Sequence, residues 1–203
     1  MADFGSHKMQ LGALKSFADG SLGSTTAWFF DPYSDAPDTR GIPSPQLLQP
    51  AEMYEEMRRA DKAGLQLAVQ AIGDRAIKPS WACLKSLKWK TAPQTAACAS
   101  QAMTRSLLKR GIFAGDKCCA CSLDAGTVLA FGSDWFVAPI SRLMGIYAAA
   151  TRRTLDGKHP NGCVPEQNIS VAEAVHAYTM GSAYASFEEG RKGRPCSVIT
   201  GYF

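Results

Sequence analysis

An amphipathic pattern stands out in the first half of the chain. Residues 51–63 place apolar side chains every three or four positions, with charged residues between them. The apolar positions are Met53, Met57 and Ala60. This spacing puts them on one face of a helix, and Gly64 is typical of the residue that ends one. The sequence therefore predicts a helix over 51–63.

Two segments have the pattern of strands. Residues 65–71 alternate until Gly73 and Asp74, as in a strand that runs into a loop. Residues 127–131 form a short apolar run that stops at Gly132. Because this second run is apolar on both faces, it favours a covered, parallel strand.

Two more helices are predicted towards the end of the chain. Ser141 is a candidate cap for a helix through Thr151. Its expected apolar stripe consists of Leu143, Ile146, Tyr147 and Ala150. Ser170 and Glu173 have the spacing of a capping box, in which each side chain satisfies a free backbone N–H, and that helix should end near Gly181.

Strands that alternate with helices predict an α/β fold, either doubly wound or a barrel. Residues 31–50 contain five prolines and should be a loop. Periodicity alone does not choose between the two α/β architectures.

Composition narrows the picture only a little. The 203 residues include 22 basic and 18 acidic side chains without a long block of one sign, so we expect no nucleic-acid partner. Residues 1–10 lack the apolar run of a signal peptide or membrane span, and we expect a cytoplasmic protein with no membrane partner. Seven cysteines cannot all pair within the chain, which favours reduced thiols.

Three blocks in the same order resemble motifs of the amidohydrolase superfamily, of the amidohydrolase 3 type. They are LKSFADGSLGS at 14–24, AVQAIGDRA at 68–76 and LAFGSDW at 129–135. The resemblance implies a metal-dependent hydrolase built on a TIM-type (β/α)8 barrel, with its site at the carboxyl ends of the strands. It predicts an incomplete barrel domain over 1–203 that keeps the later strands and helices, with 78–126 and 190–203 departing from the family.

The resemblance also implies which residues hold a divalent metal such as zinc. Asp134 matches the aspartate of the last strand, which is both a metal ligand and the general base. Lys15 matches a position where a modified lysine bridges two metals in some relatives. Gln70 stands where the family has a histidine, and a neutral amide is a poor ligand for zinc.

Each of these positions has a structural alternative. Lys15 would instead pair with a nearby carboxylate such as Asp19, and Asp134 would bind local backbone N–H groups. The family's first-strand and sixth-strand histidines have no counterpart in this sequence. His7, His159 and His176 lie outside the matching blocks, and His176 is expected to be an ordinary helix residue.

The resemblance implies a hydrolase of carbon–nitrogen bonds other than peptide bonds, with a small amide-type molecule as substrate. Because most of the metal ligands are missing from this sequence, we expect the activity to be weak or absent. The first alternative is a non-catalytic fragment or a pseudoenzyme that binds a partner, and open barrel edges favour self-association. The abrupt loss of resemblance also favours an altered reading frame or splice product. The second alternative, a small zinc or redox module, depends on Cys118, Cys119 and Cys121, which lack a second pair of cysteines at defined spacing.

Overall fold

The computed structural model describes residues 5–6, 9–10, 13–86, 95–99, 123–124, 128–133, 135, 139–153, 155–157, 160–162 and 165–194. The chain divides into two compact units, which are described separately. Unit 1 consists of Met1–Ala92 and Ser106–Asp116, and unit 2 of Pro93–Arg105 and Lys117–Phe203. A short antiparallel pair, β1 (Gly5–Ser6) and β2 (Met9–Gln10), opens unit 1.

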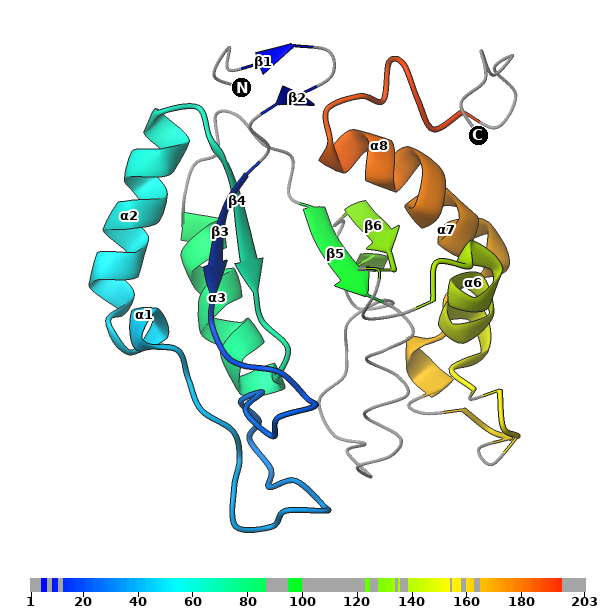
Figure 1. Cartoon of the computed structure of the whole chain (residues 1–203), viewed down its shortest axis with the longest axis horizontal. Coiled ribbons are helices and arrows are strands. Elements are labelled where there is room, and N and C mark those ends of the chain that lie inside the picture. The colour runs from blue at the N-terminus through cyan, green and yellow to red at the C-terminus, as the bar shows by residue number, and fades with distance from the viewer. Residues whose placement is uncertain are drawn as a thin grey trace. The chain divides into compact units, whose positions relative to one another are not determined.

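The centre of unit 1 is a parallel pair of strands with helices beside it. Strand β3 (Ala13–Phe17) pairs with β4 (Gln66–Gln70), and the helices are α1 (Pro45–Leu48), α2 (Pro50–Lys62) and α3 (Asp74–Ser86) (Figure 1). The register runs from Ala13 opposite Gln66 to Phe17 opposite Gln70. The predicted strand at 65–71 and the parallel α/β arrangement are therefore confirmed for this unit.

Helix α2 covers one face of the sheet, as its sequence pattern predicts. Met53, Met57 and Ala60 are buried, and the backbone turns at Gly64 with a φ of +77°. That left-handed conformation suits glycine, which has no Cβ to clash. The core of unit 1 gathers side chains from α1, α2, α3 and the end of β3; its buried members are Ala18, Leu47, Met53, Met57 and Ala76.

The expectation of a continuous loop over 31–50 is wrong at its end. Pro45 begins the short helix α1, and the Ser44 hydroxyl accepts a hydrogen bond from the Leu47 N–H at 3.1 Å. Pro50 likewise lies at the start of α2. Proline is well tolerated in the first turn because its missing N–H would have no partner there. Helix α3 was not predicted at all, and it contains Pro79 in its interior.

Unit 2 contains a second parallel pair and a helical segment packed against it. Strand β5 (Thr95–Ala99) pairs with β6 (Val128–Gly132), in register from Thr95 opposite Val128. Leu129, Ala130 and Phe131 are all buried, which confirms that β6 is covered on both faces. The helices are α6 (Arg142–Thr151), α7 (Val171–His176) and α8 (Ser182–Ala185), with a 3₁₀ turn η1 (Pro165–Gln167) and a π-helical turn η2 (Ala177–Gly181).

Helix α6 has the predicted position but a different buried face. Leu143 is 77% exposed, whereas the buried residues are Gly145, Ala148 and Ala149. Small side chains let α6 approach its neighbours closely, and Gly145 is in close contact with the Tyr178 hydroxyl. The Ser141 side chain caps nothing, although Ser141 is the first residue outside the helix.

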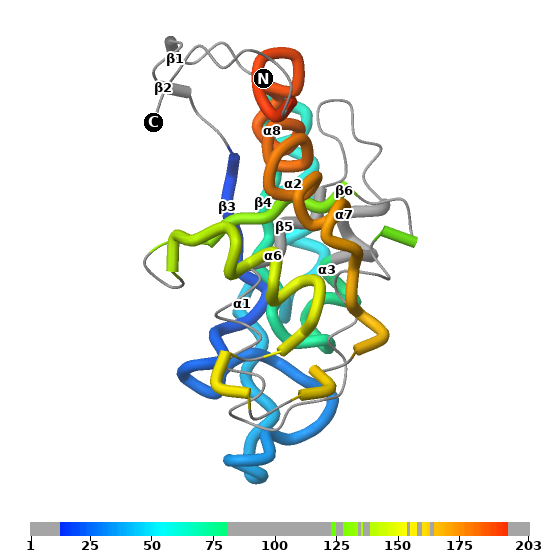
Figure 2. Tube along the Cα trace, turned by 90° about the vertical axis from the view of Figure 1, so that its right-hand side faces the viewer, coloured from blue at the N-terminus to red at the C-terminus, as the bar shows by residue number. Residues whose placement is uncertain are grey.

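The predicted capping box at Ser170 and Glu173 is present. The helix does not end near Gly181, however, because α7 continues through η2 into α8 as one rod (Figures 1 and 2). Gly181 lies against β6, where an added Cβ would come within 1.9 Å of the Leu129 carbonyl oxygen. Glycine is therefore at this position for close approach, and it does not act as a stop. In the described parts of both units, no helix has the length and apolar character to cross a membrane.

Candidate functional site at the carboxyl ends of β3 and β4

Two of the three predicted site residues lie on the same face of the β3–β4 pair. The register places Lys15 opposite Ala68 and Phe17 opposite Gln70. Because side chains alternate along a strand, Lys15, Phe17 and Gln70 share one face, and Leu14, Ser16, Leu67 and Val69 share the other. The structure thus brings the Lys15 and Gln70 positions together, with Gln70 at the carboxyl end of its strand.

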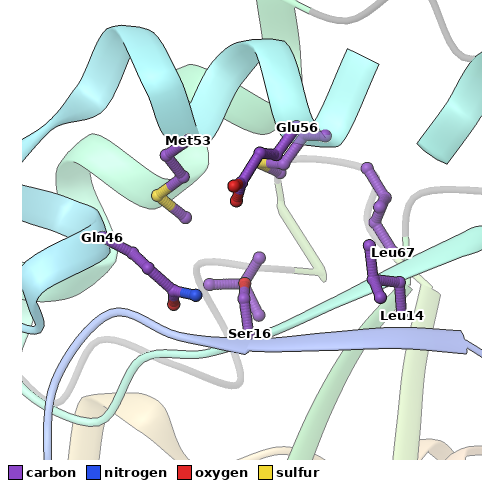
Figure 3. Close-up of a pocket in the computed structure, with 8 residues that line it drawn as sticks. Leu14, Ser16, Gln46, Met53, Glu56 and Leu67 are labelled. Carbon is purple, nitrogen blue, oxygen red and sulfur yellow. The ribbon is translucent and has the colours of Figure 1, made fainter. Parts of the chain in front are cut away.

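The opposite face packs on α2 and leaves only a small cavity. Figure 3 shows Met53 and Glu56 of α2 above Leu14 and Ser16 of β3, with Leu67 of β4 beside them. The cavity has a volume of about 30 Å³. That is room for a water molecule, not for an amide substrate. The predicted ligand positions Lys15 and Gln70 lie on the other face of the strand pair.

Lys15 does not pair with Asp19, so that particular pairing is wrong. The Lys15 ammonium lies 5.0 Å from the centre of the Phe17 ring, and both side chains are exposed. Among the described residues, no carboxylate forms an ion pair with Lys15. Its ammonium group is therefore accessible at the face that carries Gln70.

Asp19 instead holds the loops at the carboxyl ends of both strands. Its side chain is almost fully buried and accepts three backbone hydrogen bonds. The Trp28 and Gly73 N–H groups donate to Oδ2 at 2.9 and 2.7 Å, and the Ile72 N–H donates to Oδ1 at 3.0 Å. One carboxylate therefore fixes the loop after β3 to the turn between β4 and α3.

Burial raises the pKa of the Asp19 carboxyl above its ordinary value of 3.8. The hydrogen bonds from Trp28, Gly73 and Ile72 favour the charged form and offset part of this rise. The direction follows because removing water penalises a charged carboxylate more than three N–H donors recover. Asp19 is thus a buried acid whose hydrogen bonds hold the backbone of two loops.

Two glycines allow the loops to come this close. A Cβ on Gly73 would lie 1.9 Å from the Trp28 carbonyl oxygen, and one on Gly20 would lie 1.9 Å from the Thr26 hydroxyl. Ser21 and Ser24 bond to each other through their hydroxyls at 2.9 Å. The glycine-rich segment is therefore a compact turn, and its serines are occupied by local hydrogen bonds.

An arginine and two aromatic rings complete this end of unit 1. The Arg75 guanidinium carbon lies 4.4 Å from the centre of the Trp28 ring and 5.8 Å from that of Phe30. The Phe30 N–H donates to Asp74 Oδ1 at 3.0 Å, and its carbonyl accepts from the Arg40 guanidinium. Phe30 is 46% exposed, so this end of the unit presents an aromatic and cationic surface to solvent.

The third predicted residue, Asp134, lies outside the described residues. The strand that precedes it, β6, is present as predicted and ends at Gly132, and Trp135 is exposed. His7, His159, Cys118, Cys119 and Cys121 also lie outside the described part. His176 is exposed at the end of α7, in agreement with its interpretation as an ordinary helix residue.

The described side chains do not form the metal site that the resemblance implies. Within the described ranges, no three His, Cys, Asp or Glu side chains form a group able to hold a metal ion. Lys15 and Gln70 are the only predicted ligands in this part. An unmodified lysine is a cation and an amide is a weak, neutral donor, so neither suits zinc. No hydrolytic step is therefore assigned to a metal at these residues.

Comparison with known proteins identifies the family. A model of the amidohydrolase family matches residues 1–110 and 84–195, two segments that together span most of the chain. The chain therefore belongs to the amidohydrolase family, which confirms the resemblance read from the three motifs. Solved relatives of this chain are called metal-dependent hydrolases, so the family implies a metal cofactor.

The relatives are considerably longer than this chain. Protein LONG AFTER FAR-RED 3 of Arabidopsis thaliana is 28% identical, with 91% of this chain and 36% of the relative aligned. Putative amidohydrolase YtcJ of Bacillus subtilis is 26% identical, with 96% and 41% aligned. The chain thus spans about two fifths of the length of these curated relatives.

Two crystal structures of uncharacterized metal-dependent hydrolases have a similar fold. The protein from Pyrococcus furiosus superimposes with a TM-score of 0.67 at 25% identity, and the one from Pyrococcus horikoshii OT3 with 0.71 at 23%. Each comparison covers 94% of this chain and 43% of the other. The α/β elements described above therefore occur together in larger hydrolases.

Sequence reasoning missed the roles of Asp19 and Arg75. Asp19 lies in the motif at 14–24, two residues after β3, and Arg75 lies in the motif at 68–76, as the second residue of α3. An acidic residue followed by glycine at a strand end is a signal for a backbone-binding carboxylate, because it faces the free N–H groups of the turn. Its partners 53 and 54 residues away are set by the strand pairing and were not visible in the sequence.

Proposed function

We propose that this chain carries part of a metal-dependent hydrolase site for carbon–nitrogen bonds other than peptide bonds, and that it is weak or inactive as written. The observation behind the proposal is the shared face of Lys15 and Gln70 at the carboxyl end of a parallel strand pair. That edge is where α/β barrels position their catalytic groups. The membership of the amidohydrolase family supports the reaction type.

Gln70 is the reason to expect weak activity. Zinc lowers the pKa of a bound water to about 7 only when good donors hold the ion in place. An imidazole nitrogen is such a donor, whereas the Gln70 amide oxygen is neutral and weakly basic. In this proposal, Asp134 is the general base and a metal ligand, and Lys15 is a metal ligand only when it is modified to carry a negative charge.

We further propose an incomplete (β/α)8 barrel as the architecture behind this site. Unit 1 supplies a strand, a helix, a parallel strand and a second helix in succession, which is the repeating step of such a barrel. Unit 2 supplies a second parallel pair followed by helices. The similarity of the fold to larger hydrolases supports this arrangement.

The test is metal content together with turnover. Purified full chain is dialysed against metal-free buffer, its zinc is measured by elemental analysis, and hydrolysis of N-acyl amino acids is followed with and without added zinc. We expect far less than one zinc per chain and turnover near the blank. Asp134→Asn is the control, because any trace of activity from the chain must disappear in it while activity from a contaminant persists.

One tightly held zinc per chain with rapid, Asp134-dependent turnover would contradict the proposed weakness. Turnover that requires Asp134 but is unchanged by the removal or addition of zinc would instead contradict the proposed metal dependence.

Self-association is a second proposal, favoured by exposed apolar side chains on β3. Leu14 and Phe17 are 47% and 48% exposed, and among the described strands β3 pairs only with β4. A strand with an open edge and exposed apolar side chains readily pairs with another chain. We expect sedimentation to show concentration-dependent dimers that Phe17→Ser weakens, whereas Ile42→Ser, at a loop residue that is 61% exposed, leaves them unchanged.

A further inference from the structure

Strand β3 has one paired edge and one open edge. The Ala18 N–H, directly after the strand, donates to the Gln70 carbonyl of β4 at 2.8 Å. Backbone N–H and C=O groups alternate between the two edges of a strand, so Ala13, Lys15 and Phe17 point theirs away from β4. None of the described strands pairs with this outer edge. The outer edge of β3 is therefore a row of hydrogen-bonding groups that another strand can use.

The carboxyl end of the outer edge is covered by the chain's own residues. The Phe17 N–H donates to Gln46 Oε1 at 3.5 Å, and further along Asp19 forms an antiparallel bridge with Pro43. By contrast, residues 13–15 are all exposed. An added strand therefore has room at residues 13–15 and not beyond Phe17.

Leu14 is the apolar residue at the middle of this open stretch. It is 47% exposed, on the face of the strand pair that packs on α2. A second copy of the chain presents the same open edge and the same exposed leucine. When two such edges pair about a two-fold axis, one contact covers Leu14 and the partner's Leu14 together. The stretch is therefore complementary to itself, which favours a second copy as the occupant.

Lys15 and the covered end of the edge restrict how two copies align. A pairing centred on Lys15 places two ammonium groups directly opposite each other, which is destabilising. A pairing centred on Ser16 carries the partner strand into the bridge that Asp19 already forms. A pairing centred on Leu14 avoids both problems, because Lys15 then lies opposite the partner's Ala13. Charge and steric fit thus select the pairing centred on Leu14.

We propose that β3 pairs antiparallel with β3 of a second copy, with Leu14 on the two-fold axis and Lys15 opposite the partner's Ala13. The inference rests on the proposed self-association and names the interface that produces it. Each outward pair of residues exchanges two hydrogen bonds, so the contact contains about four. The competing interpretation is that two copies associate through another surface.

Single cysteines report the register directly. In the proposed pairing the two copies of residue 14 are a non-hydrogen-bonded pair with Cα atoms about 4.5 Å apart, within the range that a disulfide spans. We expect full-chain Leu14→Cys, oxidised with copper phenanthroline under dimer-forming conditions, to give a disulfide between the two copies of position 14. Peptide mass spectrometry separates this disulfide from any that the seven native cysteines form.

Lys15→Cys and Ser16→Cys are the matched controls. In the proposed register their Cα atoms are more than about 7 Å from their counterparts, beyond the reach of a disulfide. A symmetric disulfide at position 15 or 16 in place of 14 would overturn the register. A chain that sediments as a dimer but gives no symmetric disulfide at any of these positions would overturn the strand pairing itself.

Ala13→Pro tests the outward hydrogen bonds without a cysteine. The Ala13 N–H points away from β4, so proline at this edge position leaves the β3–β4 ladder intact and removes a donor only from the interface. We expect the dimer dissociation constant in sedimentation to rise about tenfold or more, while Ala13→Ser, which keeps the N–H, stays within about twofold. Unchanged dimerisation of folded Ala13→Pro would contradict the pairing. If Ala13→Pro fails to fold, the cysteine variants still decide the question.

Self-association and this particular interface fail in different ways. A chain that stays monomeric at every concentration and gives no symmetric disulfide refutes both. Dimers that Phe17→Ser weakens, but that give no disulfide in Leu14→Cys and tolerate Ala13→Pro, support self-association and refute the β3 pairing. None of these measurements involves turnover, so their outcome is independent of the hydrolysis assay.

Discussion

The Asp19 carboxylate accepts the backbone N–H of Gly73 at 2.7 Å, across 54 positions of sequence. The bond joins the loop after β3 to the turn that leads from β4 into α3. Trp28 and Ile72 donate to the same carboxylate, so three loop positions depend on one side chain. The conformation of the loops at this edge therefore depends on the Asp19 carboxylate.

Asp19→Asn should destabilise unit 1. The asparagine amide offers one acceptor oxygen in place of two, so at least one of the three buried N–H groups loses its partner. An unsatisfied buried donor costs about 1–3 kcal/mol, and we expect a loss of that size in urea unfolding. Asp38→Asn, in an exposed loop, is the control and should be neutral. Equal stability of the two variants would show that the hydrogen bonds of Asp19 do not stabilise unit 1.

The stability that Asp19 contributes should depend on pH in an unusual direction. Burial raises the pKa of Asp19 above 3.8, so the folded state binds more protons than the unfolded state between 3.8 and the folded pKa. The contribution is therefore complete below 3.8 and declines as the pH rises through the folded pKa. We expect the free energy of unfolding of wild type, minus that of Asp19→Asn, to be larger near pH 4 than near pH 7. A difference that grows with pH would contradict the raised pKa.

Gly181→Ala should disrupt the packing of the α7–η2–α8 rod against β6. The new methyl group would lie 1.9 Å from the Leu129 carbonyl oxygen, a backbone atom that cannot move without shifting β6. Overpacking of this kind costs roughly 1–3 kcal/mol, to be measured by thermal unfolding. Gly190→Ala meets no atom within 4 Å and should have little effect. If the two substitutions are equally mild, Gly181 is not at a tight contact.

Ser170→Ala should weaken the start of α7 by about 1 kcal/mol, the usual value of an N-terminal cap. The Ser170 hydroxyl accepts from the Glu173 N–H at 3.2 Å, while the Glu173 carboxylate accepts from the Ser170 N–H at 2.7 Å. Ser141→Ala is the matched control, because Ser141 begins α6 without a side-chain cap bond. Similar losses in both variants would contradict the capping role of Ser170.

The stability that the Ser170–Glu173 capping box contributes should decrease in acid. Hydrogen bonds from the Ser170 side chain and N–H lower the pKa of Glu173 below 4.5. Its contribution is therefore present above 4.5 and is lost as the pH falls through the folded pKa.

The sequence predicted those elements that depend on local pattern. Helix α2, strands β4 and β6 and the capping box follow from periodicity, glycine and cap residues over a few positions. The predictions from sequence were wrong where tertiary contacts determine which residues are buried or where a helix ends. Leu143 fits a helical stripe but is exposed, because α6 packs through its small residues, and Gly181 reads as a stop although it serves close approach to β6.

The same division holds for the candidate site. The motifs singled out Lys15 and Gln70 as ligand positions, and the parallel register of β3 and β4 then put them on one face. The use of Asp19 by Trp28, Ile72 and Gly73 depends on loops that are distant in sequence, so no local pattern shows it. For Asp134 the metal-ligand and general-base roles stay predictions.

The zinc affinity of Gln70→His, compared with wild type, tests most directly whether Gln70 is what weakens the site. Gln66→His is the matched control, because Gln66 is on the same face of β4 but about 13 Å away at its other end. We predict that Gln70→His binds zinc about tenfold or more tightly than wild type, while Gln66→His does not differ from it. Equal zinc affinity of Gln70→His and wild type, in folded protein, would contradict the account.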